Sequence, residues 1–388
     1  MKQFKYPLLS ILSIIFICVC VYFIKIIGYS FHTPKISVIM STYNRANTMT
    51  GAIESILTQT EHDFEFIIID DGSTDNTLTI LKEYQRKDPR IKILENGENQ
   101  GLIYSLNRGL SVAKGEFVAR MDDDDVSLPW RFERQLLAMK ENPDIILMGT
   151  RITSANANIK KTTGPSVIEN PDVTQLNSYT SSGLAHPTIM FRKSFLDKHH
   201  IQYRSDNLYA EDCGLYADIW NAGGKISNLQ EHLLRYGVKE NVKKPSKYGH
   251  IQYNTFKKIQ REKISKLFEP EEHLLGSYQS LLSRCELWDK MIQSNPGKNI
   301  LNQEVLEETF KKRCPAEYKN ALFVKHDFWE DFLVYEADNR LRRYSNNNRA
   351  TVIQKNDHDI TIKWDQYGTE TFRINDKHQF VLVKHKTQ

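Results

Sequence analysis

Short apolar runs alternate with amphipathic stretches between Lys35 and about Met148, and this alternation limits the possible folds of the 388-residue chain more than any other feature. The apolar runs predict strands at 36–40, 64–69, 91–94, 116–121 and 145–148. The stretches between them predict helices at 48–57, 75–86 and 101–113, and Pro129 opens another. Strands that alternate with helices indicate an α/β fold, with a mostly parallel sheet flanked by helices.

Polar clusters follow three of these predicted strands, at the point where each strand ends. Residues 41–44 follow the first strand, residues 70–73 follow the second, and Asp122 to Asp125 follow the fourth. Ligands of such sheets bind in the crevice beyond the carboxyl ends of the strands. The sequence therefore predicts a binding site at this edge.

The four consecutive carboxylates, Asp122 to Asp125, indicate a divalent cation. Like charges at short range raise one another's pKa, and a bound cation removes that penalty. Alternate residues of an extended segment face the same way, so Asp122 and Asp124 can converge on one ligand. The alternative is a solvated acidic turn before Pro129.

The cluster after the second strand has two possible tasks. Asp75 can cap the helix that follows, whereas Asp71 can accept a hydrogen bond from a nucleotide base. Tyr43, in the first cluster, can stack on such a base.

In combination, these segments resemble the family 2 glycosyltransferases. The resemblance covers about residues 35–238 and is carried by ISVIMSTYN (36–44), IIDDGSTD (68–75) and ARMDDDD (119–125), followed by Pro129 and Arg131-Phe132-Glu133. It implies a GT-A fold and transfer of a sugar with inversion of the anomeric centre.

The resemblance also implies roles for individual residues. Asp71 would contact the base, usually uracil, and Ser41 and Tyr43 would line the nucleotide site. Asp122-Asp123-Asp124 matches the D-x-D motif, in which the first Asp tends to face the ribose and the last binds the metal, Mn²⁺ or Mg²⁺. We therefore expect Asp124 and Asp122 as metal ligands, and Asp122 and Asp123 beside the nucleotide. The middle residue of the motif is usually small, and Asp123 departs from that pattern.

A base for the acceptor hydroxyl is expected later in the chain. Tyr209-Ala210-Glu211-Asp212 precedes a helical stretch, and resembles the family's E-D motif, in which the Asp is the general base. The resemblance assigns that role to Asp212. Alternatively, Glu211 and Asp212 are first-turn acids that complement the helix dipole. His186 lies in a further family-like segment, whereas Tyr236-Gly237-Val238-Lys239 departs from the family's Tyr-Arg-x-His-like turn.

Composition excludes some functions. A formal net charge of +4 and a pI of about 8.5 are too mild to indicate nucleic-acid binding. The five cysteines form no C-x-x-C pair, which argues against a zinc ribbon or a disulfide scaffold. Reduced thiols are the simpler interpretation, and they favour a cytosolic catalytic domain.

The N-terminal residues 1–32 predict a membrane anchor. Leu8 to Ile24 is almost continuously apolar, and a helix needs roughly 20 apolar residues to span a bilayer. The alternative, a cleaved signal peptide, lacks a good cleavage site. Lysines flank the run on both sides, so the positive-inside rule gives no orientation. A bacterial enzyme would face the cytosol, and a type II secretory protein would face the lumen.

Beyond the expected catalytic domain at 33–245, the chain changes character twice. Residues 246–346 predict an amphipathic helical extension, and residues 347–388 predict a small β-rich appendage.

The predicted function is transfer of a sugar from a nucleotide-sugar donor, with UDP favoured through the resemblance, to a glycan or glycolipid acceptor. One alternative is a nucleotidyltransferase, which would want a Gly-rich basic loop where residues 41–44 stand. The other is a membrane-anchored glycan-binding or scaffolding protein without turnover.

Overall fold

The computed structural model describes residues 33–154, 159–161, 165–179, 183–237, 249–270, 274–275, 281–296 and 301–314, and from there to residue 386 the strands of a small domain. The predicted anchor in residues 1–32 lies outside these ranges. Within them, no helix combines the length and apolar character needed to cross a membrane.

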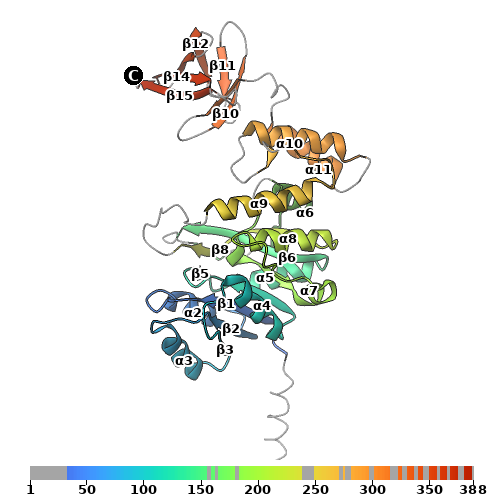
Figure 1. Ribbon diagram of the computed structural model, residues 1–388. Helices are drawn as coiled ribbons and strands as arrows, with labels where there is room; N and C mark the ends of the chain where they lie inside the picture. Colours follow the sequence, from blue (N-terminus) through green and yellow to red (C-terminus); the bar gives the residue numbers. More distant parts are fainter. Residues whose placement is uncertain are drawn as a thin grey trace, which may run out of the picture.

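An eight-stranded mixed sheet forms the centre of the larger part (Figure 1), in the order β3-β2-β1-β4-β7-β6-β8-β5. Its strands are β1 (Ile36–Thr42), β2 (Phe64–Asp70), β3 (Ile91–Glu95), β4 (Phe117–Met121), β5 (Val126–Ser127), β6 (Ile145–Ser154), β7 (Met190–Arg192) and β8 (Lys225–Tyr236). The pairs β1–β2, β2–β3, β1–β4 and β6–β8 are parallel, whereas β5 and β7 run antiparallel to their neighbours. The predicted α/β fold with a mostly parallel sheet is confirmed.

Helices cover both faces of this sheet. They are α2 (Thr50–Leu57), α3 (Thr77–Lys87), α4 (Leu102–Val112), α5 (Arg131–Glu141), α6 (Pro171–Asn177), α7 (Lys193–His199) and α8 (Glu211–Asn221), with a 3-10 turn, η1 (His186–Thr188). Side chains alternate between two cores, because successive residues of a strand face opposite ways. Val38 and Met40 pack with α2 and α5, whereas Ile39 packs with α4 and α8.

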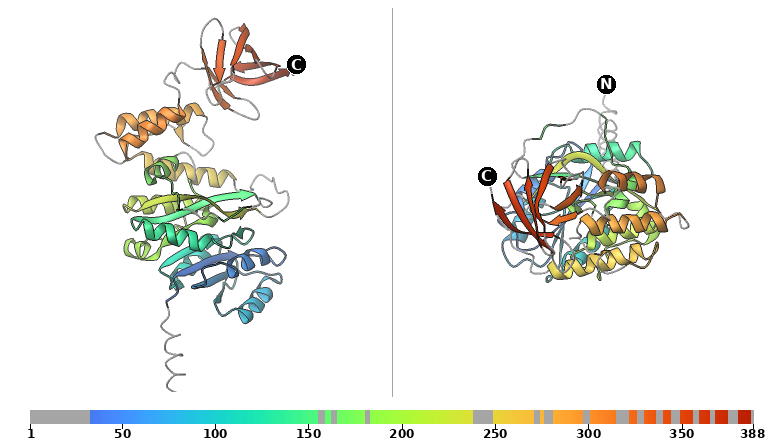
Figure 2. Two further views of the ribbon diagram at one scale, coloured as in Figure 1. Left: turned by 180° about the vertical axis from the view of Figure 1, so that it is seen from behind. Right: turned by 90° about the horizontal axis from the view of Figure 1, so that it is seen from above.

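Among the described residues, three further α-helices follow: α9 (Gly249–Ile264), α10 (Leu281–Ser294) and α11 (Gln303–Arg313). In Figures 1 and 2 the α10–α11 pair lies between the part that contains the eight-stranded sheet and the C-terminal strands. A hydrophobic core separate from the two cores of the sheet joins α6 and α9 to the α10–α11 pair, and it includes Leu176, Ile264 and Trp288.

The prediction of reduced thiols from the sequence is wrong for two of the cysteines. Cys285 on α10 and Cys314 at the end of α11 form a disulfide, with their Cα atoms 5.8 Å apart. Both side chains are buried. The pair is 29 residues apart in sequence, and only the packing of α10 on α11 brings it within bridging distance.

The helical prediction for 246–346 is also wrong in its last part, because strands begin there at Leu322. The strands β9 (Leu322–Lys325), β10 (Glu330–Tyr335), β11 (Arg340–Arg343), β12 (Arg349–Lys355), β13 (Asp359–Trp364), β14 (Gly368–Ile374) and β15 (Phe380–Lys386) close into a barrel. Short apolar runs such as those of β9 and β10 do not distinguish helix from strand by periodicity. The predicted strands near 360–364, 370–374 and 380–383 are confirmed as β13 to β15.

Candidate active site

The three polar clusters lie together at one edge of the sheet. Thr42 pairs with Asp70 in the β1–β2 ladder, and Met40 pairs with Met121 in the β1–β4 ladder. The loops that begin at Tyr43, Asp71 and Asp122 therefore start side by side. This placement is the one that the strand pattern predicts.

The first two loops are fastened to each other by Asn44. Its backbone N–H donates to the Ser73 hydroxyl (3.0 Å), and its side-chain oxygen accepts from the Thr74 N–H (2.8 Å). Asn44 has a positive φ of 53°, which asparagine tolerates better than most residues. Tyr43 beside it is 42% exposed, so its ring is available to a ligand.

Asp71 is engaged by the protein itself. Its carboxylate accepts hydrogen bonds from the backbone N–H groups of Gln100 and Gly101 (2.9 Å each) and from the Asn96 side chain (2.7 Å). Only 3% of the residue is exposed. Because Gly101 precedes α4, Asp71 fixes the start of that helix from the adjacent strand end. Its contact with a base stays a prediction.

The acidic run forms a turn that brings three carboxylates together. Ligand oxygens of Asp122, Asp124 and Asp125 all lie within 4.8 Å of one another. Asp123 faces elsewhere: its Oδ1 lies 3.3 Å from Nε of Arg45. The expected pair Asp122 and Asp124 thus converges, and the third member of the group is Asp125.

Asp125 is the deepest of these acids, with 1% of its surface exposed. Its Oδ1 accepts the Gly237 N–H (2.9 Å), whereas its Oδ2 is buried and has no hydrogen-bond partner in the described part of the chain. Burial raises the pKa of Asp125 to about 7. A buried carboxylate oxygen without a partner, beside two other acids, fits an oxygen-ligated cation such as Mg²⁺ or Mn²⁺.

Arg120 stands behind the acidic turn. This buried strand residue forms an ion pair with Asp122, while its Nε and Nη1 have no hydrogen-bond partner among the described residues. Its charge also acts on the acids of α8: burial raises the pKa of Asp212, and the positive charge of Arg120 opposes that rise. The acidic turn and the first turn of α8 therefore share one electrostatic environment.

The first turn of α8 presents Glu211 and Asp212. Oδ1 of Asp212 accepts the Cys213 N–H (2.8 Å), and burial raises the pKa of Glu211 to about 7. Nδ1 of His186 lies 4.0 Å from Oε1 of Glu211, and its Nε2 is 2.9 Å from the Tyr203 hydroxyl. Burial lowers the pKa of His186 well below its usual value, so this imidazole is neutral.

The backbone before this turn is strained. Tyr209 has a φ of 64°, which is a genuine outlier for an aromatic residue. Such conformations persist where the surrounding structure determines them, and they cluster at functional sites.

The geometry is matched by comparisons with known proteins. A sequence profile described as Glycosyl transferase family 2 matches residues 37–199. Over 244 residues the chain is 34% identical to an uncharacterized glycosyltransferase of Haemophilus influenzae, a match that covers 60% of this chain and 74% of the relative. The chain belongs to glycosyltransferase family 2.

Two further likenesses agree with this family. The O-antigen biosynthesis glycosyltransferase WbnJ of Escherichia coli is 37% identical over 213 residues, which are 52% of this chain and 79% of the relative. A crystal structure of S. aureus TarS in complex with UDP-GlcNAc has a TM-score of 0.50 at 19% identity, and the match covers 78% of this chain and 98% of that chain. The second likeness shows the fold, and this glycosyltransferase has the GT-A fold.

Sequence reasoning missed two groups of this glycosyltransferase. Arg45 approaches Asp123 and Asp124, with 3.9 Å from its Nη2 to Oδ2 of Asp124. The second missed group is Arg120. A charged residue inside the otherwise apolar run 117–121 could have pointed to it. Both arginines supply positive charge beside the acids.

Tyr236 and Gly237, where the sequence departs from the family's Tyr-Arg-x-His-like turn, also lie at this site. The Gly237 amide holds Asp125, and Tyr236 lies close enough that, besides burial, the charges of Asp122 and Asp125 raise its pKa. Tyr236 is nevertheless 51% exposed. The turn at the end of β8 therefore borders the acidic group although its residues differ from the family pattern.

Proposed function

We propose that this glycosyltransferase moves a sugar from a nucleotide-sugar, with UDP favoured, to a hydroxyl of a glycan or glycolipid acceptor, with inversion. The observation that carries the proposal is the convergence of Asp122, Asp124 and Asp125 within 4.8 Å, at the edge that Asp71 and Tyr43 also occupy. A site that gathers acids beside an exposed aromatic ring suits a divalent cation and a nucleoside diphosphate.

The cation would be Mn²⁺ or Mg²⁺, held by Asp124 and Asp122 with Asp125 as an added ligand. The buried, unpartnered Oδ2 of Asp125 supports this assignment. When bound, the cation supplies positive charge that stabilises the departing nucleoside diphosphate. Asp123 would stay with Arg45, at the nucleotide side of the turn.

Asp212 would serve as the general base. Its carboxylate has one oxygen fixed by the Cys213 N–H, and burial raises its pKa, which makes it a stronger proton acceptor. As the acceptor oxygen forms its bond to the anomeric carbon, Asp212 takes the hydroxyl proton and the bond to the diphosphate oxygen breaks. One such displacement inverts the anomeric centre.

The arginines would complement the donor. Arg45 lies at the mouth of the site with 37% of its side chain exposed, so its guanidinium can turn from Asp123 to a phosphate. Arg120 is buried and keeps Asp122 in place. Neutral His186, held by Tyr203, would border the acceptor side next to Glu211.

The E. coli relative and the N-terminal apolar run bear on the acceptor and the location. The O-antigen name of the E. coli relative supports a surface glycan as acceptor. We infer that residues 1–32 anchor the chain in a membrane, and that in a bacterium the catalytic domain faces the cytosol, where nucleotide-sugars are made. The disulfide counts against that side, because disulfides persist mainly in oxidising compartments, so the donor supply alone supports it.

A donor screen tests the proposal. Full-length protein in detergent micelles would be incubated with UDP-, GDP- and dTDP-sugars and Mn²⁺ or EDTA, and nucleoside diphosphate release followed. We expect turnover of one donor, lost with EDTA and in Asp124→Asn, but kept in Asp197→Asn, a surface acid paired with Lys193. If no donor turns over and no nucleotide shifts the melting temperature in the presence of metal, the proposal is wrong.

A further inference from the structure

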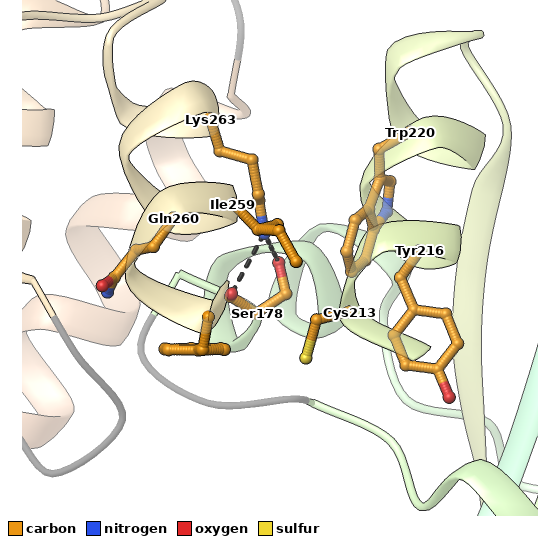
Figure 3. Close-up of a pocket in the computed structure, with 8 residues that line it drawn as sticks. Ser178, Cys213, Tyr216, Trp220, Ile259, Gln260 and Lys263 are labelled. Atoms are coloured by element: carbon orange, nitrogen blue, oxygen red, sulfur yellow. Dashed lines mark hydrogen bonds between the residues drawn. The ribbon is translucent and has the colours of Figure 1, made fainter. Parts of the chain in front are cut away.

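Helix α8 packs against α9 beside the chemistry at its first turn. Cys213, Tyr216 and Trp220 lie along one face of α8 at helical spacing, and with Ile259 and Lys263 of α9 they line a small cavity (Figure 3). The cavity has a volume of about 10 Å³, which is close to the space of one water molecule. Because residues of both helices line this cavity, the position of α9 also determines the position of α8.

Lys263 of α9 is the residue that bridges the elements around this cavity. Its Nζ donates to the Ser178 carbonyl (3.0 Å) and lies 2.5 Å from the Ser178 hydroxyl, just after α6. The same ammonium lies 4.4 Å from the ring centre of Tyr179 and 4.7 Å from that of Trp220 on α8. One side chain therefore joins α6, α8 and α9.

This arrangement is unusual for a lysine. The residue is 7% exposed, and no carboxylate forms an ion pair with it in the part of the chain that the structure describes. Burial lowers the pKa of Lys263 to about 7, with Cys213 and Lys266 as the nearby titratable groups. An apolar side chain would fill the same space without the desolvation penalty. The two rings and two oxygens are what hold the amine here.

The contacts that surround Lys263 lead to Asp212. Cys213 lines the cavity and directly follows Asp212, whose carboxylate accepts the Cys213 N–H. The apolar part of α9 adds to this contact, because Ile259 packs with Ala210 and Ala217 on either side of Cys213. A shift of α9 would therefore move the turn that presents Asp212.

We propose that Lys263 is a positioning residue that clamps α6 and α9 onto α8 and so sets the place of Asp212 in the active site. The proposal rests on the proposed role of Asp212 as the general base. It assigns a task in catalysis to the first helix beyond the family domain.

Hydrogen exchange tests the clamp without any substrate. In full-length Lys263→Met, which keeps the length and removes the charge, we expect amides of residues 211–217 to exchange about tenfold faster. Lys258→Met is the matched control on α9, since Lys258 forms an exposed ion pair with Asp206 and should leave these amides unchanged. Wild-type exchange in Lys263→Met would overturn the proposal.

Kinetics then separate positioning from stability. With the donor that the screen identifies, kcat of Lys263→Met should fall about tenfold while KM for the donor stays within twofold, because only the base is displaced. An unchanged kcat would overturn the proposal, whereas a wild-type protein without turnover would overturn the proposed function and leave the exchange result to decide on Lys263. If Lys263→Met does not fold, Ser178→Ala removes one acceptor and should speed exchange at 211–217 about threefold; no change there would sink the proposal.

Discussion

The backbone N–H of Gly237 donates a hydrogen bond of 2.9 Å to Oδ1 of Asp125, across 112 residues of sequence. This bond joins the end of β8 to the acidic turn after β4. It occupies one carboxylate oxygen and leaves the other, which is buried, without a partner among the described residues. Asp125 is therefore held in one orientation, toward Asp122 and Asp124.

From this relationship we predict that Asp125→Asn weakens Mn²⁺ binding about tenfold, which corresponds to about 1.4 kcal/mol. The amide keeps an oxygen for the Gly237 N–H but brings no negative charge to the cation. Titration calorimetry with Mn²⁺ measures the change. Asp123→Asn is the matched control, because Asp123 faces Arg45, and its effect should be smaller than threefold; equal losses in the two variants would contradict the assignment.

Asp71→Asn should destabilise the fold by roughly 3 kcal/mol, because the carboxylate accepts three hydrogen bonds at a buried position and an amide leaves donors facing donors. Urea unfolding followed by circular dichroism measures the loss. Asp75→Asn at the exposed start of α3 should cost less than about 1 kcal/mol, because the asparagine oxygen can still accept the Thr77 N–H. If Asp71→Asn has the same free energy of unfolding as wild type, the contacts of Asp71 with the start of α4 do not stabilise the fold.

For Asp212→Asn we expect kcat to fall by roughly 10²–10⁴, with KM for the donor nearly unchanged, because a base acts only as the acceptor attacks. Nucleoside diphosphate release in the presence of acceptor gives both constants. Glu211→Gln, one residue earlier on the same turn, should lower kcat less than tenfold. The reverse ranking of the two variants would move the base to Glu211.

Reduction of the Cys285–Cys314 bond should lower the stability of the α10–α11 pair by about 2–4 kcal/mol, since the bond closes a loop with a sequence separation of 29. Peptide mapping without reductant should recover the two cysteines in one linked product. Thermal unfolding of Cys285→Ala, compared with Cys213→Ala at the free cysteine, measures the effect. If both cysteines are alkylated without prior reduction, they are free thiols, as predicted from the sequence.

Local pattern was enough to predict where the acids meet. Asp122 and Asp124 are neighbours in the chain, and strand ends in a parallel sheet share one edge, so their convergence needed no tertiary information. The same logic placed Tyr43 and Asp71 beside them. What each acid contacts was not predictable in this way.

The partners of these acids come from distant segments. Asp71 is bound by Asn96, Gln100 and Gly101, and Asp125 is bound by Gly237 at the far end of β8. Backbone N–H groups carry no signature in a sequence, so bonds of this kind are visible only in the folded chain. The disulfide and the first barrel strands were missed for the same reason: long-range packing decides them.

Lys263 provides a prediction about pH that needs no ligand. The pKa of this buried lysine is lowered to about 7, from an ordinary value near 10.5 in the unfolded chain. Below pH 7 both states hold the proton and the folded state bears the full penalty of a buried ammonium. Between pH 7 and about 10 the unfolded state binds more protons, so this residue makes the free energy of unfolding rise with pH, by up to about 1.4 kcal/mol per pH unit.

Urea unfolding of wild type and Lys263→Met at pH 6.5, 8.0 and 9.5 isolates that contribution, because other titrating groups cancel in the difference between the two proteins. The stability of wild type relative to Lys263→Met should increase by about 1 kcal/mol or more from pH 6.5 to 9.5. Lys258→Met should show no such trend, since its amine is exposed. A difference that stays constant across this range would mean that the two rings and the Ser178 oxygens keep Lys263 charged throughout, as cation–π contacts with desolvated ammonium groups can.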